Sequence, residues 1–524
     1  MNSRYKPLYE AILALEQNNR EPETINAIVN FPFPTMYPGQ KEIIEKASKA
    51  ETGCVIASHT GFGKSACFLT LTRGKPSLVI EPRKFLQSQL SEGYFNDFVL
   101  YGRSGYACPL SYAGTAASSY CLAKEDCSGT SYPQTCPDKS TACLNGTKDH
   151  KVFMVDGKYK IYPCEFCEYN NAVKQATMVL KAGGTVICNF GNFWPFVKLA
   201  DIIVLDEADL FFKERSAPIA LRFTKPKDGI VNIKELMERE VIGLKAVVQD
   251  KDPSLIYKAT NALFNAGFFK ANSELCFTYQ KKDKIYVEVD PRNTNILKNK
   301  LFKGKQVIVV SATAGEFDLP AFSASIHQRA GIFFVPVGNM TSKNLKMNPF
   351  LMNSAAKTIK EISEYFEMVF DNKHTIIHAA NLATHAASLF KILGEDDCTM
   401  HQSGKLAETI NTYLESGKKY LIVASAEYGA DFEFSKLQIG LKFPFPNLDE
   451  RMNTLKRSMG PVAFSAYYAG EARTRTIQMA GRVSRGFNDF GVTILLDSKY
   501  LDDFVMNKQL YPEWYRERVN PRVF

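Results

Sequence analysis

Short runs of consecutive hydrophobic residues recur through the first 310 residues of the chain, with polar or helical stretches between them. Each run is too short for a helix and has the length of a strand. Continuous apolar runs without polar alternation are typical of parallel strands that are covered on both faces. The strands predicted in this way lie at residues 54–56, 78–80, 185–190, 202–205 and 306–310.

The second half of the chain repeats this alternation. Strands are predicted at residues 375–378, 420–424 and 491–496, and a helical pattern lies near residues 382–393. Strands that alternate with helices predict a second parallel sheet. A chain of 524 residues also exceeds the size at which a single hydrophobic core stops growing, so several domains are expected.

Two stretches interrupt the first sheet. Between residues 100 and 171 the apolar periodicity disappears, and Gly, Ser, Thr and Cys dominate. From about residue 214 to 300 the pattern is largely helical, at 233–244 and 254–269, and it ends in a pair of predicted strands near 275–279 and 284–289. We interpret both stretches as inserts between strands of the first sheet.

The run ASHTGFGKS, at residues 57–65, has the pattern of a phosphate-binding loop between a strand and a helix. Its glycines let the backbone amides face inward, its lysine supplies a positive charge, and its serine hydroxyl suits Mg²⁺. The pattern departs at its first position, where Ser58 replaces glycine. The residues predicted to bind the nucleotide here are Thr60, Gly61, Gly63, Lys64 and Ser65.

An acidic group follows the strand at residues 202–205. At a strand end opposite a phosphate loop, Asp206 is expected to hold Mg²⁺ and Glu207 to polarise the attacking water. Taken alone, the run DEAD at residues 206–209 would also suit the N-terminus of a helix. The phosphate loop upstream favours the catalytic interpretation.

Other polar residues are also assigned to the nucleotide. Gln40 lies at the start of a predicted helix, and its amide is suited to reading an adenine edge, with an ordinary surface glutamine as the alternative. Gln478, Arg482 and Arg485 have the spacing i, i+4 and i+7 and are predicted to share one helical face. The two arginines suit a triphosphate reached from the second domain; an exposed basic face is the alternative.

The long insert without apolar periodicity is rich in cysteine. A long stretch without a secondary-structure pattern is hard to order without a cross-link, and several thiolates that bind one metal would supply a cross-link. The spacing is too irregular for a simple zinc ribbon, whereas iron–sulfur ligation tolerates it. The cysteines of this insert are Cys108, Cys121, Cys127, Cys136, Cys143, Cys164 and Cys167. The others are interpreted as packing residues: Cys54, Cys67, Cys188, Cys276 and Cys398.

Composition sets wider limits. With 45% hydrophobic and 23% charged residues the chain has an ordinary soluble composition, and its net charge of +9 permits a polyanionic partner without establishing one. The sequence opens without an apolar leader and has no apolar run near 18 residues. We therefore expect an intracellular protein without a membrane segment, cytoplasmic or nucleoid-associated, or nuclear in a eukaryote.

The order ASHTGFGKS, LDEAD, SAT and QMAGRVSR resembles that of superfamily 2 helicases. The two inserts narrow the resemblance to the XPD/DinG family of iron–sulfur helicases. Residues 102–108 are similar to the segment around that family's first cluster cysteine, residues 167–169 to its last, and FPFP at 443–446 to its proline-rich turn. The chain departs from the family at Asp209, where histidine is usual, and at YGADF, where EGxDF is usual.

The resemblance implies an α/β fold with two RecA-like parallel-sheet motor domains, and a cysteine-rich cluster insert and a mostly helical arch insert in the first. Motor domain 1 would comprise residues 1–105, 176–213 and 301–335, the cluster insert 106–175, the arch 214–300, and motor domain 2 336–524. The implied cofactors are ATP, Mg²⁺ and a [4Fe-4S] cluster, with zinc as the alternative metal. By position, the cluster ligands would be Cys108, Cys121, Cys127 and Cys167. Cys136, Cys143 and Cys164 remain as substitutes or as a separate zinc site.

The activity implied by the resemblance is ATP-dependent unwinding of duplex DNA by translocation 5′→3′ on single-stranded DNA, in repair, replication or recombination. The expected partners are single-stranded DNA, duplex junctions and protein loading factors, and a monomer is expected. One alternative is a nucleic-acid-stimulated ATPase that remodels protein–DNA or RNA complexes. The other is a nucleotide-gated DNA-binding module that does not unwind.

Overall fold

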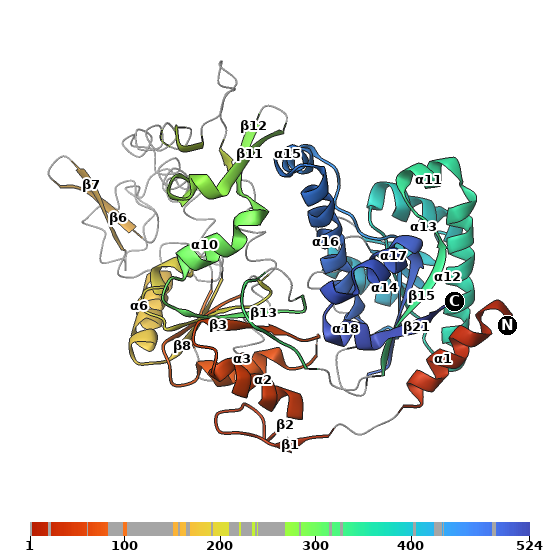
Figure 1. The fold of residues 1–524 in the computed structure, drawn as a ribbon, viewed down its shortest axis with the longest axis horizontal. Helices are drawn as coiled ribbons and strands as arrows, with labels where there is room; N and C mark the ends of the chain where they lie inside the picture. Colours follow the sequence, from red (N-terminus) through yellow and green to blue (C-terminus); the bar gives the residue numbers. More distant parts are fainter. Residues whose placement is uncertain are drawn as a thin grey trace, which may run out of the picture.

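The computed structural model shows two α/β lobes, each built on a seven-stranded sheet (Figure 1). The structure describes residues 3–18, 23–59, 61–81, 98–101, 150–155, 158–163, 168–189, 192–208, 219–221, 233–235, 238, 268–281, 284–313, 317–324, 329–401, 405–423, 432, 434–484 and 489–524. In this part of the chain no helix is long and apolar enough to cross a membrane.

The first sheet is parallel throughout and contains every strand predicted for it. Its strands, in spatial order, are β14 (Ala321–Phe322), β3 (Gly53–Ala57), β13 (Gln306–Ser311), β9 (Ile202–Leu205), β4 (Ser77–Ile80), β8 (Thr185–Cys188) and β5 (Phe98–Leu100). The two edge strands β14 and β5 were not predicted from the sequence, because their runs are short. The central order β3-β13-β9 matters most for the site described below.

Both faces of the first sheet are covered. Helices α2 (Pro38–Ser48) and α3 (Lys64–Thr72) pack on the face that carries Cys54 and Ile56, while α6 (Glu168–Lys181) packs on the face that carries Val55. Strand β3 is therefore buried along its whole length, as a run without polar alternation predicts.

The second sheet is also parallel throughout. Its strands, in spatial order, are β17 (Cys398–Met400), β18 (Tyr420–Val423), β16 (Thr375–His378), β19 (Leu437–Gly440), β20 (Gly491–Asp497), β15 (Ala330–Gly338) and β21 (Val519–Val523). The sequence pattern identifies only three of them, at β16, β18 and β20. Because β15 pairs with β20 and β21, the second sheet already includes residues 330–335, which the predicted boundary gives to the first motor domain.

The described part of the second lobe also contains helices. They are α11 (Ser342–Met347), α12 (Phe350–Phe370), α13 (Ala387–Leu393), α14 (Leu406–Ser416), α15 (Glu450–Met459), α16 (Pro461–Ala480), α17 (Ser498–Met506) and α18 (Glu513–Arg518). The helix predicted near residues 382–393 is present as a π-helical turn, Leu382–Ala386, that continues into α13.

The N-terminal helix α1 (Lys6–Glu16) packs on the second lobe, although its residues precede the first sheet in the sequence (Figure 1). The ring of Tyr9 stacks on that of Tyr365 with centroids 3.8 Å apart, and the hydroxyls of Tyr5 and Thr358 lie 2.9 Å apart. The chain thus starts on the second lobe and then crosses to build the first.

The two inserts contain strands as well as helices. In the cysteine-rich insert, β6 (His150–Val155) and β7 (Lys158–Pro163) form an antiparallel hairpin, a correction to the prediction that this stretch has no regular pattern. In the second insert, the predicted strand pair is confirmed as β11 (Cys276–Lys281) and β12 (Lys284–Val289), and β10 (Ile219–Leu221) adds a third strand. Helix α10 (Thr294–Leu301) leads back to the first sheet. The helices predicted at 233–244 and 254–269 lie mostly outside the described residues.

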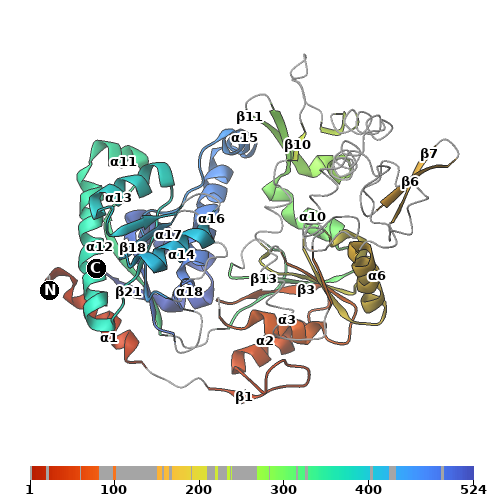
Figure 2. The same ribbon diagram turned by 180° about the vertical axis from the view of Figure 1, so that it is seen from behind.

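The β11–β12 hairpin reaches the second lobe and packs against α15 and α16 (Figure 2). Phe277 and Tyr279 from the hairpin share an apolar cluster with Met452, Leu455 and Phe464. The two lobes are therefore in contact through the second insert, in addition to the contact near the phosphate loop described below.

Candidate nucleotide site

The phosphate loop connects the C-terminal end of β3 to the N-terminus of α3. Gly61 and Gly63 both have left-handed backbone conformations, with φ of 84° and 80°. Glycine is favoured in this conformation because glycine has no Cβ. At Gly63 a Cβ would also lie only 2.5 Å from Nε2 of Gln40. The two glycines singled out from the sequence are thus required by the shape of this loop.

Lys64 begins α3 and folds back over its own loop. Its Nζ donates hydrogen bonds to the carbonyl oxygens of Ser58, at 2.9 Å, and His59, at 3.0 Å. No side chain of the described residues caps the N-terminus of α3, so the helix end suits an anion. A nucleotide phosphate is a stronger acceptor than a neutral carbonyl and would draw the ammonium away from the loop. The residues therefore fit a nucleotide.

Asp206 and Glu207 follow β9 and lie at the same sheet edge as the phosphate loop. Strand β13 pairs with β3 on one side and with β9 on the other, in parallel register. The Asp206 Oδ1 accepts a hydrogen bond from the Glu207 amide at 3.0 Å, and Glu207 has a φ of 45°, which is strained for a residue with a side chain. Such strain is concentrated at functional sites and supports a role for this turn. Asp209 lies outside the described residues.

The SAT segment follows β13 and so lies between the phosphate loop and the acidic turn. The Ser311 hydroxyl accepts a hydrogen bond from the Thr313 amide at 3.0 Å and lies 3.0 Å from the Thr313 hydroxyl. The segment is a tight turn at the end of β13, between the strands that lead to the phosphate loop and to the acidic turn.

Gln40 is a structural part of the site in this conformation. Its side chain is only 4% exposed, so the alternative of a surface glutamine is wrong. Its Oε1 accepts from the Tyr37 amide at 2.8 Å, and its Nε2 donates to the Phe62 carbonyl at 2.8 Å. The amide thereby joins the start of α2 to the phosphate loop. Recognition of adenine by this side chain stays a prediction.

The helix of the second lobe that carries Gln478 ends earlier than the spacing predicts. Helix α16 stops at Ala480 and Gly481 follows as its C-cap, so Arg482 is not on a continuous helical face. The two side chains still lie together, with Arg482 Nη2 3.5 Å from Gln478 Oε1. Arg482 is 4% exposed, so the alternative of an exposed basic face is wrong for it. Arg485 and Thr60 lie outside the described residues.

A buried histidine lies close to Arg482. The amide group of Gln438 donates to the Met479 carbonyl and the Thr493 hydroxyl, both at 2.8 Å, so its Oε1 is left to accept from His378 Nε2 at 3.1 Å. This contact places a proton on Nε2 of His378. Burial, reinforced by the charge of Arg482, lowers the pKa of His378 to about 4.

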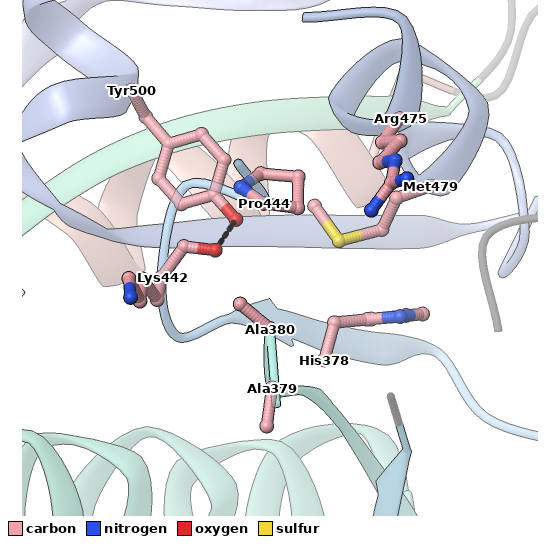
Figure 3. Close-up of a pocket in the computed structure, with 8 residues that line it drawn as sticks. All are labelled: His378, Ala379, Ala380, Lys442, Pro444, Arg475, Met479 and Tyr500. Carbon is pink, nitrogen blue, oxygen red and sulfur yellow. Dashed lines mark hydrogen bonds between the residues drawn. The ribbon is translucent and has the colours of Figure 1, made fainter. Parts of the chain in front are cut away.

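A basic pocket opens at the carboxyl ends of β16 and β19 (Figure 3). Lys442, Arg475 and His378 line it, and the Tyr500 hydroxyl donates to the Lys442 carbonyl at 2.8 Å. Burial lowers the pKa of Lys442. The sequence analysis did not identify this pocket. The available signal was His378, the last residue of the strand predicted at 375–378, because ligands bind at the carboxyl ends of strands in open α/β sheets.

The two lobes meet beside the phosphate loop through one aromatic residue. Trp514 of α18 lies against the His59 ring, with centroids 6.1 Å apart, and its Nε1 donates to the Ala312 carbonyl at 3.3 Å. Sequence reasoning missed Trp514, because α18 carries no motif.

The five cysteines outside the cysteine-rich insert confirm the packing interpretation. Cys54, Cys67, Cys188 and Cys398 are buried and Cys276 is half-buried. Burial raises the pKa of each thiol, to about 12 for Cys67. No three metal-ligating side chains come together among the described residues. All seven cysteines of the insert, including the predicted ligands Cys108, Cys121, Cys127 and Cys167, lie outside those residues.

Comparisons with known proteins agree with this geometry. Residues 355–518 match the family of the helicase C-terminal domain. A solved XPD helicase matches with a TM-score of 0.57 and 12% identity, covering 93% of this chain and all of its own. Xpd4 from S. tokodaii matches with a TM-score of 0.52 and 11% identity, covering 93% of this chain and 99% of its own. An apo XPD structure matches with a TM-score of 0.51 and 11% identity, covering 90% of this chain and 97% of its own. No curated protein sequence matches.

The solved structures confirm that the chain has the fold of XPD helicases, with two RecA-like domains, as the resemblance implies. The match of residues 355–518 to the helicase C-terminal domain supports the expectation of an ATP-hydrolysing helicase.

Proposed function

We propose that this XPD-like chain is an ATP-dependent helicase that translocates 5′→3′ on single-stranded DNA and separates duplex DNA. The observation that carries the proposal is the order β3-β13-β9 in one parallel sheet, because it supports one nucleotide site built from the phosphate loop, the SAT turn and the acidic turn. A phosphoryl-transfer site needs this set of groups at one edge.

Each group has a role that follows from its chemistry. When MgATP is bound, it supplies the phosphoryl group that is transferred to water. Lys64 and the loop amides would hold phosphate oxygens, and Ser65 and Asp206 would hold the metal. Glu207 orients and polarises the attacking water. Gln478, Arg482 and Arg485 serve as the contribution of the second lobe, since guanidinium groups stabilise the charge that develops on a transferred phosphoryl group.

Nucleic acid is the proposed track for the motor. The pocket lined by Lys442 and Arg475 lies at the carboxyl end of the second sheet and is suited to a backbone phosphate. The chain's net charge of +9 is compatible with a polyanion. Backbone contacts of this kind make binding tolerant of sequence and weaker at high salt. The choice of DNA and the 5′→3′ polarity rest on the resemblance to the XPD/DinG family.

A [4Fe-4S] cluster held by Cys108, Cys121, Cys127 and Cys167 belongs to the same proposal. It rests on the density of cysteines in the insert and on the resemblance, with zinc as the alternative metal. A monomer acting inside the cell on single-stranded DNA and duplex junctions, in repair, replication or recombination and with protein loading partners, completes the proposal.

Strand-separation assays with three substrates test this function. The substrates are duplexes with a 5′ single-stranded tail, a 3′ tail, and an RNA loading strand. Unwinding of the 5′-tailed DNA alone supports the proposal. Unwinding that requires RNA favours the remodelling ATPase, and stimulated ATP hydrolysis without unwinding of any substrate favours the nucleotide-gated binding module.

A further inference from the structure

Trp514 touches two loops of the first lobe at once. Its indole lies edge-to-face on the His59 ring at an interplanar angle of 67°, and its Nε1 donates to the Ala312 carbonyl. His59 belongs to the phosphate loop and Ala312 to the SAT turn. Trp514 is only 1% exposed, so this contact is fully desolvated.

The two loops lie on neighbouring strands. Ala57 at the end of β3 pairs with Ser311 at the end of β13. A single side chain from the second lobe therefore covers both loop exits. A rotation of the second lobe relative to the first must either carry these loops with the indole or break its contacts.

The indole is held firmly from its own side. The Arg518 guanidinium lies 5.1 Å from its ring centroid, and the Tyr515 ring lies 5.7 Å away. Ala312 of the first lobe packs in the same apolar cluster as Trp514 and Phe443 of the second lobe. Because Trp514 is packed tightly in its own lobe, a displacement of α18 should displace the phosphate loop and the SAT turn as well.

His59 connects this contact to the phosphate-binding lysine. The His59 carbonyl accepts a hydrogen bond from Lys64 Nζ at 3.0 Å, and the His59 ring lies edge-to-face on Phe62 at 5.8 Å. Lys64 must leave the His59 carbonyl to reach a phosphate. Binding of a phosphate in the loop therefore breaks the hydrogen bond from Lys64 to the His59 carbonyl, and His59 is the residue that Trp514 contacts.

We propose that Trp514 is a positioning residue that couples occupation of the phosphate loop to the angle between the two lobes. The inference rests on the proposed function, because it assumes that a nucleotide binds at Lys64. Coupling of this kind is reciprocal: a nucleotide that alters the His59–Trp514 contact shifts the lobe angle, and a partner that shifts the lobe angle alters nucleotide affinity.

Tryptophan fluorescence tests the coupling directly. The chain has two tryptophans, Trp514 and Trp194, and Trp194 is 38% exposed on a different part of the first lobe. Trp194→Phe leaves Trp514 as the single reporter. We expect the emission of this variant to change when the non-hydrolysable analogue AMP-PNP is added with Mg²⁺. Constant emission at concentrations where a fluorescent ATP analogue is bound and displaced by AMP-PNP would overturn the inference.

Trp514→Phe separates coupling from packing, because phenylalanine keeps an aromatic ring on His59 but lacks the Nε1–H donor. We expect kcat for DNA-stimulated ATP hydrolysis to fall about tenfold and KM for ATP to rise by a similar factor, because a residue that couples the loop to the lobe angle affects both closure and nucleotide affinity. Trp194→Phe is the matched control and should leave both constants unchanged. An unchanged kcat in Trp514→Phe would overturn the coupling, whereas failure of the unsubstituted chain to bind ATP would overturn the proposed function together with it.

Discussion

Glu288 of β12 and Arg451 of α15 form an ion pair across the contact between the second insert and the second lobe. The Arg451 Nε donates to one carboxylate oxygen, and the Tyr279 hydroxyl donates to the other at 2.8 Å. Burial raises the pKa of Glu288, and the charge of Arg451 acts in the opposite direction. Hydrogen bonds from Arg451 and Tyr279 therefore stabilise the Glu288 carboxylate within the apolar contact between the hairpin and the second lobe.

Removing the arginine alone should loosen this contact. Arg451→Met leaves Glu288 as a buried charge without its cation, and the loss of one member of such a pair costs about 3–5 kcal/mol. We expect faster proteolysis and faster amide exchange in the β11–β12 hairpin. The double substitution Arg451→Met with Glu288→Gln should recover much of the protection, because no charge then remains buried.

Arg457→Met is the matched control for that experiment, since Arg457 lies exposed on the same helix. Equal loosening by Arg457→Met would show that the effect does not arise from the ion pair. The absence of any recovery in the double variant would lead to the same conclusion.

Lys64→Ala should abolish ATP turnover and leave single-strand binding largely intact. The ammonium is the charge of the phosphate loop, and loss of one such group at a reacting phosphoryl typically costs about 100-fold or more in rate. ATP hydrolysis and fluorescence anisotropy with labelled single-stranded DNA measure the two properties. Lys41→Ala, at an exposed position on α2, should change neither. Normal hydrolysis by Lys64→Ala would refute the site.

Acid should destabilise the second lobe through its buried histidines. Burial lowers the pKa of His378 and of His385 to about 4, from an ordinary value of 6.5. Between these values the unfolded chain binds more protons, so the free energy of unfolding is intact above pH 6.5 and falls as the pH drops toward 4. The slope is about 1.4 kcal/mol per pH unit for each histidine.

Urea unfolding of the full chain at several pH values between 7.5 and 5 measures this effect. His378→Gln removes one of these titrating groups, so the stability of this variant should fall less steeply with acid. The same slope in both proteins would show that His378 does not titrate in this range.

The cysteine-rich insert predicts a coloured protein. Anaerobically purified chain should be brown, with iron and acid-labile sulfide in the ratio expected of a cluster. Chelation of the iron should abolish unwinding before it abolishes ATP hydrolysis, because the phosphate loop at residues 57–65 is not part of the cysteine-rich insert. A colourless preparation that contains zinc would contradict the cluster assignment and favour the alternative metal.

The sequence predicts the strands and the phosphate loop of the first lobe better than it predicts the contacts between distant segments. The buried strands of the first sheet and the phosphate loop are local patterns, because a run such as residues 202–205 has to be covered on both faces wherever it folds. The predicted helical face of Gln478, Arg482 and Arg485 fails beyond Ala480, since Gly481 ends α16 and the spacing rule holds only within a helix.

Contacts between distant segments have no such local signal. The pairing of Trp514 with His59 and of Glu288 with Arg451 joins positions far apart in the sequence, and no motif links the two members of either pair. Packing of α1 on the second lobe is another case, because an amphipathic helix shows which of its faces is buried and not which domain buries it.

Strand separation of tailed DNA duplexes tests the central claim most directly. With ATP and Mg²⁺ present, the unsubstituted chain should release the strand from a duplex with a 5′ single-stranded tail and fail with a 3′ tail, and Lys64→Ala should release neither. ATP hydrolysis that is stimulated by DNA but gives no strand release from either duplex would contradict the claim that this protein is a helicase.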